Sequence, residues 1–182
     1  MRKFDQWTLE SIRSVGASMS WFEEQRFEWT PPIANAMDQM MGGKSIVLIT
    51  DHDRKWFAHY ITSSLNKRSQ DRPMIPIVCI DALYPHYDHI SGGESIDMLV
   101  DMLDIAFKGD YFFWYIGRGD DRRADIAKRN ANSLLWIMDE RFQNALVLRS
   151  HDELIDIKLL QLYRLFDKTL GAVLFGEINV RE

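Results

Sequence analysis

The sequence has little cysteine and no long apolar run. A single cysteine, Cys79, stands among the 182 residues, so an internal disulfide is impossible and a zinc finger lacks its ligands. The N-terminus has no apolar core of the kind that signal peptides carry. No uninterrupted apolar stretch approaches the roughly 18 residues of a membrane-spanning helix. These absences predict a soluble protein of a reducing, cytoplasmic compartment.

Positive charge is also scarce, because 22 Lys and Arg stand against 27 Asp and Glu, for a net charge of −5. Non-specific nucleic-acid binding depends on Lys and Arg that displace counterions from phosphates. An anionic membrane surface attracts the same two residue types. The charge balance therefore predicts neither direct nucleic-acid binding nor membrane association.

Apolar and aromatic residues, by contrast, are abundant. Hydrophobic residues make up 46% and charged residues 27%, which are ordinary values for a globular protein. The length predicts one domain over residues 1–182. Aromatic residues reach 12% and include six tryptophans, more than a single core of this size ordinarily uses. Since aromatics also anchor interfaces, the surplus indicates self-association or a partner surface.

Short apolar runs alternate, for the most part, with helical patterns of apolar residues. This alternation predicts an α/β fold with three layers (αβα) around a five-stranded parallel sheet. Pro31 and Pro32 are expected to separate the first two helices, and Pro76 suits a strand at the edge of the sheet. The predicted strands are 45–50, 74–80, 111–116, 134–138 and 145–148, and the predicted helices are 5–28, 33–41, 52–66, 94–107, 120–131 and 153–178.

The two terminal helices, 5–28 and 153–178, are apolar over too wide an arc for one flank of one core. We therefore expect part of this surface to bind a partner or a second copy of the chain. The candidate residues are the aromatic side chains off the main apolar faces: Trp7, Trp21, Phe27, Trp29 and Phe175.

An acidic edge on the predicted helix 94–107 is an alternative surface for a basic partner. It is made by Asp97, Asp101 and Asp104. A solvated helix face explains the same pattern.

Ligands of open parallel sheets bind beyond the carboxyl ends of the strands, which here means the loops 50–54, 81–93, 117–121 and 139–143. Asp51 could be catalytic and His52 could act as a general base at 50–54, and Arg118 could help to hold a phosphate at 117–121. In the structural interpretation, Asp51 and Asp120 cap the helices that follow, and His52 is exposed. The Ser and Thr hydroxyls that usually line phosphate sites are missing from these loops, which favours the structural interpretation.

Three further motifs carry weak signals. Gly-Gly-Lys-Ser at 42–45 resembles the end of a P-loop, but it precedes a strand instead of opening a helix. His86 and His89 have no third ligand cluster for a metal. Cys79 lies within a predicted strand, where a thiol is usually a small buried hydrophobe. The sequence thus predicts no catalytic residue, no metal and no cofactor.

Several aromatic-rich strings resemble the HobA family, and the resemblance extends from about residue 4 to residue 177. They are WTL at 7–9, IRS at 12–14, WFEEQRFEW at 21–29, LITD at 48–51, WF at 56–57, FWYIGR at 113–118, LQLYRLFDKT at 160–169 and FGE at 175–177.

The resemblance implies a non-enzymatic regulator of replication initiation. A HobA-like protein binds the N-terminal domain of the initiator DnaA and organises DnaA at the chromosomal origin. The resemblance also implies a sugar-isomerase (SIS) type αβα fold, a homotetramer, and a structural counterpart in DiaA. SIS proteins hold phosphosugars in Ser/Thr-rich loops, and the loss of those hydroxyls implies that this chain has abandoned that site. The alternative is a phosphosugar-binding enzyme or sensor of the same fold that uses Asp51, His52 and Arg118 in the loops 50–54 and 117–121.

Overall fold

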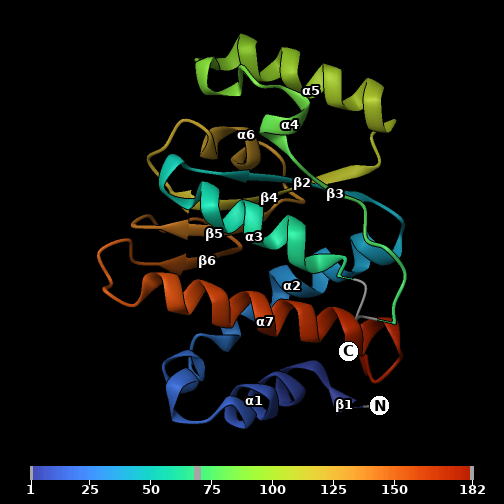
Figure 1. The fold of residues 1–182 in the computed structure, drawn as a ribbon, viewed down its shortest axis with the longest axis vertical. Coiled ribbons are helices and arrows are strands. Elements are labelled where there is room, and N and C mark those ends of the chain that lie inside the picture. Colours follow the sequence, from blue (N-terminus) through green and yellow to red (C-terminus); the bar gives the residue numbers. More distant parts are fainter. Residues whose placement is uncertain (1, 68–70, 181–182) are drawn as a thin grey trace.

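A five-stranded parallel sheet crosses the middle of the molecule (Figure 1). The computed structural model describes residues 2–67 and 71–180. The strand order is β3-β2-β4-β5-β6, and every neighbouring pair is parallel, which confirms the predicted sheet. The strands are β2 (Ser45–Thr50), β3 (Ile77–Cys79), β4 (Tyr111–Arg118), β5 (Leu134–Met138) and β6 (Ala145–Leu148).

Helices flank this sheet on both faces (Figure 1). One face carries α4 (Ile80–Leu83), α5 (Gly93–Phe107) and α6 (Ala124–Lys128). The other face carries α2 (Arg26–Met41), α3 (Lys55–Leu65) and α7 (Ile155–Leu174). Short elements complete the described chain: β1 (Arg2–Lys3) paired with β7 (Ile178–Asn179), and the 3₁₀ helices η1 (Ala17–Phe22), η2 (His52–Arg54) and η3 (Tyr87–His89).

The first helix, α1 (Phe4–Val15), lies on the outer side of α7, away from the sheet (Figure 1). Toward the sheet, α7 packs Phe166 against Trp114, with 4.5 Å between ring centroids. Toward the outer side, the Lys168 ammonium lies 5.6 Å from the Trp7 ring centroid. Because α7 is covered from two sides, much of its wide apolar arc is buried within the chain itself.

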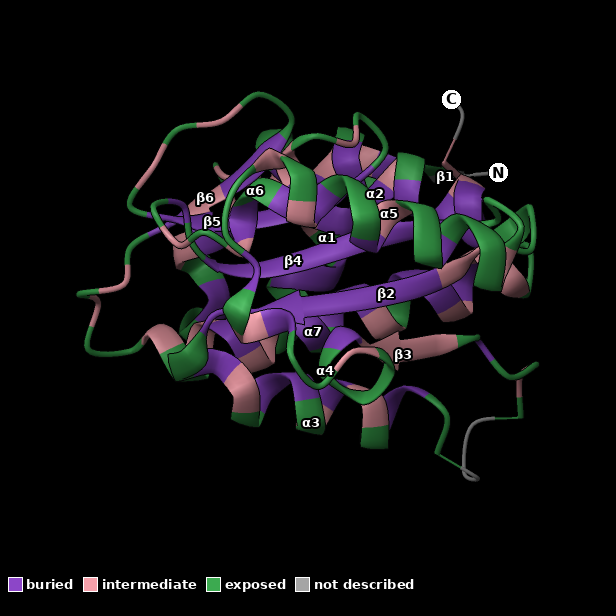
Figure 2. Ribbon diagram, turned by 90° about the horizontal axis from the view of Figure 1, so that it is seen from above, coloured by how far each residue is buried: buried purple, intermediate pink, exposed green. Residues whose placement is uncertain are grey.

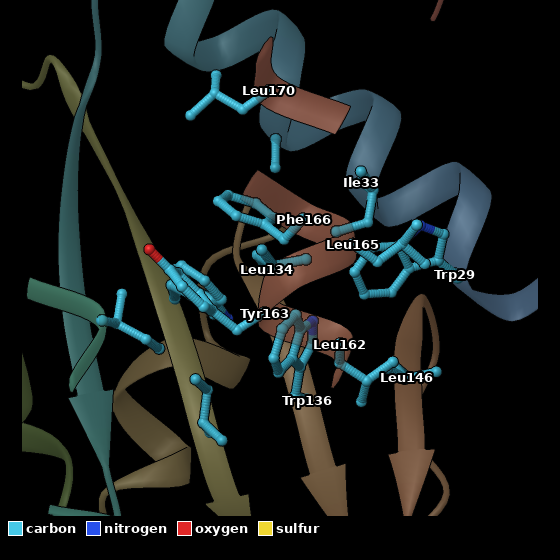
Figure 3. Packing of buried hydrophobic residues seen from close by; sticks show 14 of the residues in the cluster. Trp29, Ile33, Leu134, Trp136, Leu146, Leu162, Tyr163, Leu165, Phe166 and Leu170 are labelled. Carbon is cyan, nitrogen blue, oxygen red and sulfur yellow. The ribbon is translucent and has the colours of Figure 1, made fainter. Parts of the chain in front are cut away.

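Aromatic rings fill the core between α7 and the sheet (Figure 3). Trp136 lies at the centre of this cluster, 5.0 Å from Trp114 and 5.7 Å from Trp29 between ring centroids. β2 and β4 are buried along nearly their whole length (Figure 2). Continuous apolar runs are typical of strands that are covered on both faces, and the same cover explains why these strands are recognisable in the sequence.

The N-terminal helices begin and end at other residues than predicted. A single helix over 5–28 is wrong, because α1 ends before Gly16, whose φ of +92° suits glycine. The break predicted at Pro31 and Pro32 is also wrong, since both lie inside α2. These prolines leave the carbonyls of Phe27 and Glu28 without helical donors, but both residues are exposed, so water can satisfy them.

Other boundaries differ by a few residues. The edge strand β3 is shorter than the predicted 74–80 and begins after Pro76. The predicted helix 120–131 is reduced to the five residues of α6, and the predicted helix 153–178 ends at Leu174. Among the described residues, no helix is long and apolar enough to cross a bilayer.

Candidate functional site

The crevice at the carboxyl ends of β2 and β4, where the strand order reverses, is filled by the chain's own side chains. Asp51 follows β2 and is buried. Its carboxylate accepts hydrogen bonds from the Arg118 backbone N–H at 2.8 Å and from the Arg54 guanidinium at 3.0 Å. It also accepts from the Arg54 backbone N–H at 3.0 Å, which confirms that Asp51 caps the helical turn after β2. His52 is exposed and lies outside this network.

Burial raises the pKa of Asp51, and the Arg118 N–H and the Arg54 charge oppose that rise. Next to it, the Tyr115 hydroxyl donates to the Arg118 carbonyl at 2.7 Å, and burial raises the pKa of this phenol as well. Gly117 closes the cluster, since a Cβ there would lie 2.7 Å from Asp51 Oδ2 and 2.7 Å from Tyr115 Oη. These contacts fill the space beside Gly117 between the two strand ends.

We expect Gly117→Ala to lower the free energy of unfolding by roughly 1–3 kcal/mol, because the new methyl group must displace buried polar atoms. Gly171→Ala is the matched control, because nothing lies within 4 Å of a Cβ at that position in α7. Removing glycine from the helix interior is expected to raise stability by roughly 0.5–1 kcal/mol. Chemical denaturation followed by circular dichroism measures both changes. Equal and small effects at the two positions would show that the crevice is not tightly packed.

Lys55 and Arg123, near the mouth of the crevice, each pair with a carboxylate. Arg123 donates to Asp88 at 2.9 Å and to Asp121 at 3.1 Å, while the Lys55 ammonium lies 3.2 Å from Asp88. Lys55 and Arg123 hold the pKa of Asp88 below its usual range against the effect of burial. A phosphate entering here would have to replace carboxylates that already pair with these cations.

Arg118, the cation predicted for phosphate binding, is held in the same way. Its guanidinium donates to Asp120 at 2.7 and 3.0 Å. The predicted cap at Asp120 is wrong, because α6 begins only at Ala124 and its N-cap position is Arg123. The neighbouring Asp121 accepts from the Arg123 backbone N–H at 2.9 Å and organises the turn before α6.

The minor motifs also have structural explanations. Asp88, between the two loop histidines, is occupied by Arg123 and Lys55. Within residues 2–67 and 71–180, no group of three or more His, Cys, Asp or Glu is arranged to hold a metal ion. Burial raises the pKa of the Cys79 thiol to about 11, so the reactive thiolate is rare at neutral pH.

The five aromatic residues predicted as a binding site are separated by the fold. Trp29 has no exposed surface and packs against Phe22 and Trp136 in the core, and Trp7 is buried under α7. Only Phe27 and Phe175 are well exposed, at 61% and 63%. They stand at the first turn of α2 and just after the end of α7, and so do not form one patch.

Trp21 is half-buried and connects η1 to α7 through two side-chain contacts. Its indole N–H donates to Gln161 Oε1 at 2.9 Å, and the Lys158 ammonium lies 4.5 Å from the ring centroid. One edge of Trp21 lines a groove of about 860 Å³ beside the edge strand β6, together with Phe27 and Phe142.

A second groove, of about 390 Å³, lies between α1 and α7. Its apolar wall includes Val15 and Ile157, which are 53% and 55% exposed. Sequence reasoning missed this pair, although both residues belong to the terminal helices that it singled out. The sequence shows that both residues are apolar. Only the packing of α1 on α7 determines that they stay exposed.

Comparisons with known proteins agree along the whole chain. A family model described as "HobA: DNA replication regulator" matches residues 1–180. The DNA replication regulator protein HobA of Helicobacter pylori is 29% identical over 188 residues, covering 99% of this chain and 100% of that protein. Two crystal structures of the H. pylori protein are similar at 27% identity: HobA with a TM-score of 0.75, covering 98% of each chain, and a HobA–DnaA (domain I–II) complex with a TM-score of 0.73, covering 98% of this chain and 99% of that one.

Proposed function

Because this chain belongs to the HobA family of DNA replication regulators, we propose that it is a non-enzymatic adaptor that binds the N-terminal domain of DnaA. Its role is to promote the assembly of DnaA at the chromosomal replication origin. The observation that carries this proposal is the solved complex of a similar chain with DnaA domains I–II. The adaptor acts in the cytoplasm, where the chromosome and DnaA meet.

The filled crevice supports a binding role over an enzymatic one. Asp51 and Arg118 are occupied by each other and by neighbouring side chains, so neither is placed to act on a substrate. The net charge of −5 also fits a protein that reaches the origin through DnaA rather than by contacting DNA phosphates.

Self-association is the second part of the proposal, and the expected oligomer is a homotetramer. The exposed apolar residues Val15 and Ile157 along the α1–α7 groove, with Phe175 just after the end of α7, supply a surface that such an assembly would bury. Several copies held together would raise the local concentration of bound DnaA without new chemistry.

Size-exclusion chromatography with light scattering tests both parts in one experiment. Alone, the protein is expected at four times the chain mass. With the DnaA N-terminal domain it is expected to gain mass in proportion to the bound copies. A tetramer that gains no mass would contradict the adaptor function and leave the assembly standing. A monomer that binds DnaA would contradict the tetramer and support the adaptor function.

The alternative, a phosphosugar-binding enzyme or sensor that uses loops 50–54 and 117–121, predicts stabilisation by such ligands. Binding at 100 times Kd would add about 2.7 kcal/mol. We expect millimolar sugar phosphates to leave the melting temperature unchanged, because Arg118 and Arg123 are already paired with Asp120, Asp121 and Asp88. A reproducible thermal shift would revive the alternative.

A further inference from the structure

Residues 84–91 form a strap that connects α4 to α5 (Figure 1). Its backbone hydrogen bonds are local: the Tyr87 N–H donates to the Tyr84 carbonyl at 3.0 Å, and the Ile90 N–H donates to the Tyr87 carbonyl at 3.1 Å. Among the described residues, no backbone hydrogen bond joins this strap to a strand of the sheet. Its position against the rest of the molecule therefore depends on its side chains.

Two of these side chains are buried and one forms ion pairs. Tyr87 and Ile90 are buried and belong to the core on the α5 side of the sheet. His86 and His89 are exposed. In the part of the chain that the structure describes, Asp88 is the strap's only side chain in an ion pair. A single carboxylate thus supplies the strap's electrostatic contact with neighbouring elements.

Both oxygens of the Asp88 carboxylate accept hydrogen bonds, and the donors come from different elements. Oδ1 accepts from Arg123 Nε at 2.9 Å and from a second nitrogen of the same guanidinium. Oδ2 accepts from the Lys55 ammonium at 3.2 Å. Lys55 is the first residue of α3, and Arg123 directly precedes α6. The same two cations lie 5.5 and 5.6 Å from the centroid of the Tyr87 ring, so they contact the strap at two consecutive residues.

This geometry is that of an anion site with an internal occupant. A guanidinium and an ammonium that converge on one point are suited to bind phosphate or carboxylate oxygens. Lys55 has no other ion-pair partner among the described residues, and Arg123 keeps only Asp121 when Asp88 moves away. The Arg123 side chain is 11% exposed and the Asp88 side chain 36%, so dissolved ions can reach the carboxylate while the guanidinium stays shielded.

We propose that Asp88 is an autoinhibitory latch: it occupies an anion site formed by Lys55 and Arg123, and free oxyanions that compete for these cations release residues 84–91. This device goes beyond the adaptor function, because it requires the protein and an anion but no DnaA. A tethered carboxylate acts at an effective concentration on the order of millimolar, so release is expected only when the free anion clearly exceeds that concentration. The lowered pKa of Asp88 keeps the latch charged at neutral pH.

The latch is tested with Asp88→Asn, which removes the charge and keeps the shape of the side chain. Hydrogen exchange followed by mass spectrometry is expected to show the amides of residues 84–91 exchanging about tenfold faster than in the wild type, because a charge-assisted contact no longer opposes local opening. Asp53→Asn is the matched control, since Asp53 also pairs with a cation, Arg54, but its side chain is 73% exposed. It is expected to leave the exchange of the strap within about twofold.

Competition for the two cations is tested with inorganic phosphate. At about 50 mM phosphate, the strap of the wild type is expected to exchange severalfold faster than in sodium chloride of the same ionic strength, since chloride screens charges but cannot bridge both cations. Asp88→Asn frees the cations, so phosphate is also expected to raise its melting temperature more than that of the wild type. The double variant Asp88→Asn, Arg123→Gln is expected to lose this additional rise.

The contrary outcomes are distinct. Unchanged exchange of the strap in Asp88→Asn would show that Tyr87 and Ile90 alone hold it, and would overturn the latch. Faster exchange spread evenly over the sheet would report global destabilisation and would overturn it as well. Equal effects of phosphate and chloride, or equal thermal shifts in Asp88→Asn and the wild type, would overturn the anion site and with it the proposal. Because DnaA takes part in none of these measurements, failure of the latch leaves the adaptor function standing.

Discussion

Trp29→Ala is expected to lower the free energy of unfolding by roughly 3–5 kcal/mol, the range for removing a large aromatic side chain from a packed core. Trp29 is completely buried, and its ring centroid is 5.5 Å from that of Phe22. The Trp136 ring lies on another side, 5.7 Å away between centroids, and Figure 3 shows it beside Trp29. The void would open where α2, η1 and the sheet meet. Denaturant titration followed by circular dichroism at fixed protein concentration measures the loss.

Phe27→Ala is the control, two residues earlier in α2. Phe27 is 61% exposed, and its ring lies 4.0 Å from the Arg26 guanidinium carbon. Its loss is expected to change the free energy of unfolding by only about 0.5 kcal/mol. Any larger effect of Phe27→Ala should appear in assembly or in DnaA binding. Equal destabilisation by the two variants would contradict the burial that separates them.

Asp51→Ala is expected to lower stability by roughly 3 kcal/mol, because it leaves the buried Arg54 guanidinium without its shielded partner and the Arg118 N–H without an acceptor. Only 4% of the Asp51 side chain and 7% of the Arg54 side chain are exposed. Asp51→Asn keeps an oxygen acceptor for one of these donors and is expected to lose less, about 1–2 kcal/mol.

Asp53→Ala is the matched control for this ion pair. Asp53 lies 3.3 Å from the same Arg54 nitrogen, but 73% of its side chain is exposed. Surface ion pairs contribute little, so we expect a change below about 0.5 kcal/mol. Denaturant titration measures the loss of stability in Asp51→Ala and in Asp53→Ala. Comparing the two losses shows how strongly burial changes the contribution of a carboxylate beside Arg54 to stability. A loss below about 1 kcal/mol for Asp51→Ala would show that Arg54 needs no buried carboxylate beside the exposed Asp53.

The strand-end crevice was half predictable. An acidic residue directly after a buried strand predicts a helix cap, and Asp51 does cap η2. The residue order could not show that Asp51 also bonds the N–H of Arg118, since the two lie 67 positions apart. Asp120 was misplaced for a related reason. The predicted helix was expected to begin at 120, but α6 begins at Ala124, and Asp121 rather than Asp120 accepts from the Arg123 N–H in the turn before it.

The surface sites were harder to predict than the crevice. The aromatic surplus suggested residues for a partner or oligomer surface, yet Trp29 belongs to the core, while Phe27 is exposed. The acidic edge predicted on the helix 94–107 is exposed in the structure. The sequence did not show that Met98 and Ile105 of the same helix would also be exposed. A helical period identifies residues that share a face, but it does not show what packs against that face.

The sequence by itself determined the α/β class, the parallel sheet, the N-cap at Asp51 and the family. Each of these depends on local features, because a strand buried on both faces needs a continuous apolar run and a cap needs a side-chain oxygen beside free N–H groups. Only the tertiary structure decided that α1 covers the outer side of α7, that Pro31 and Pro32 remain inside a helix, and which aromatics reach the surface. Those outcomes depend on contacts between residues far apart in the chain, where solvent or a packed neighbour determines whether the same apolar side chain forms core or docking surface.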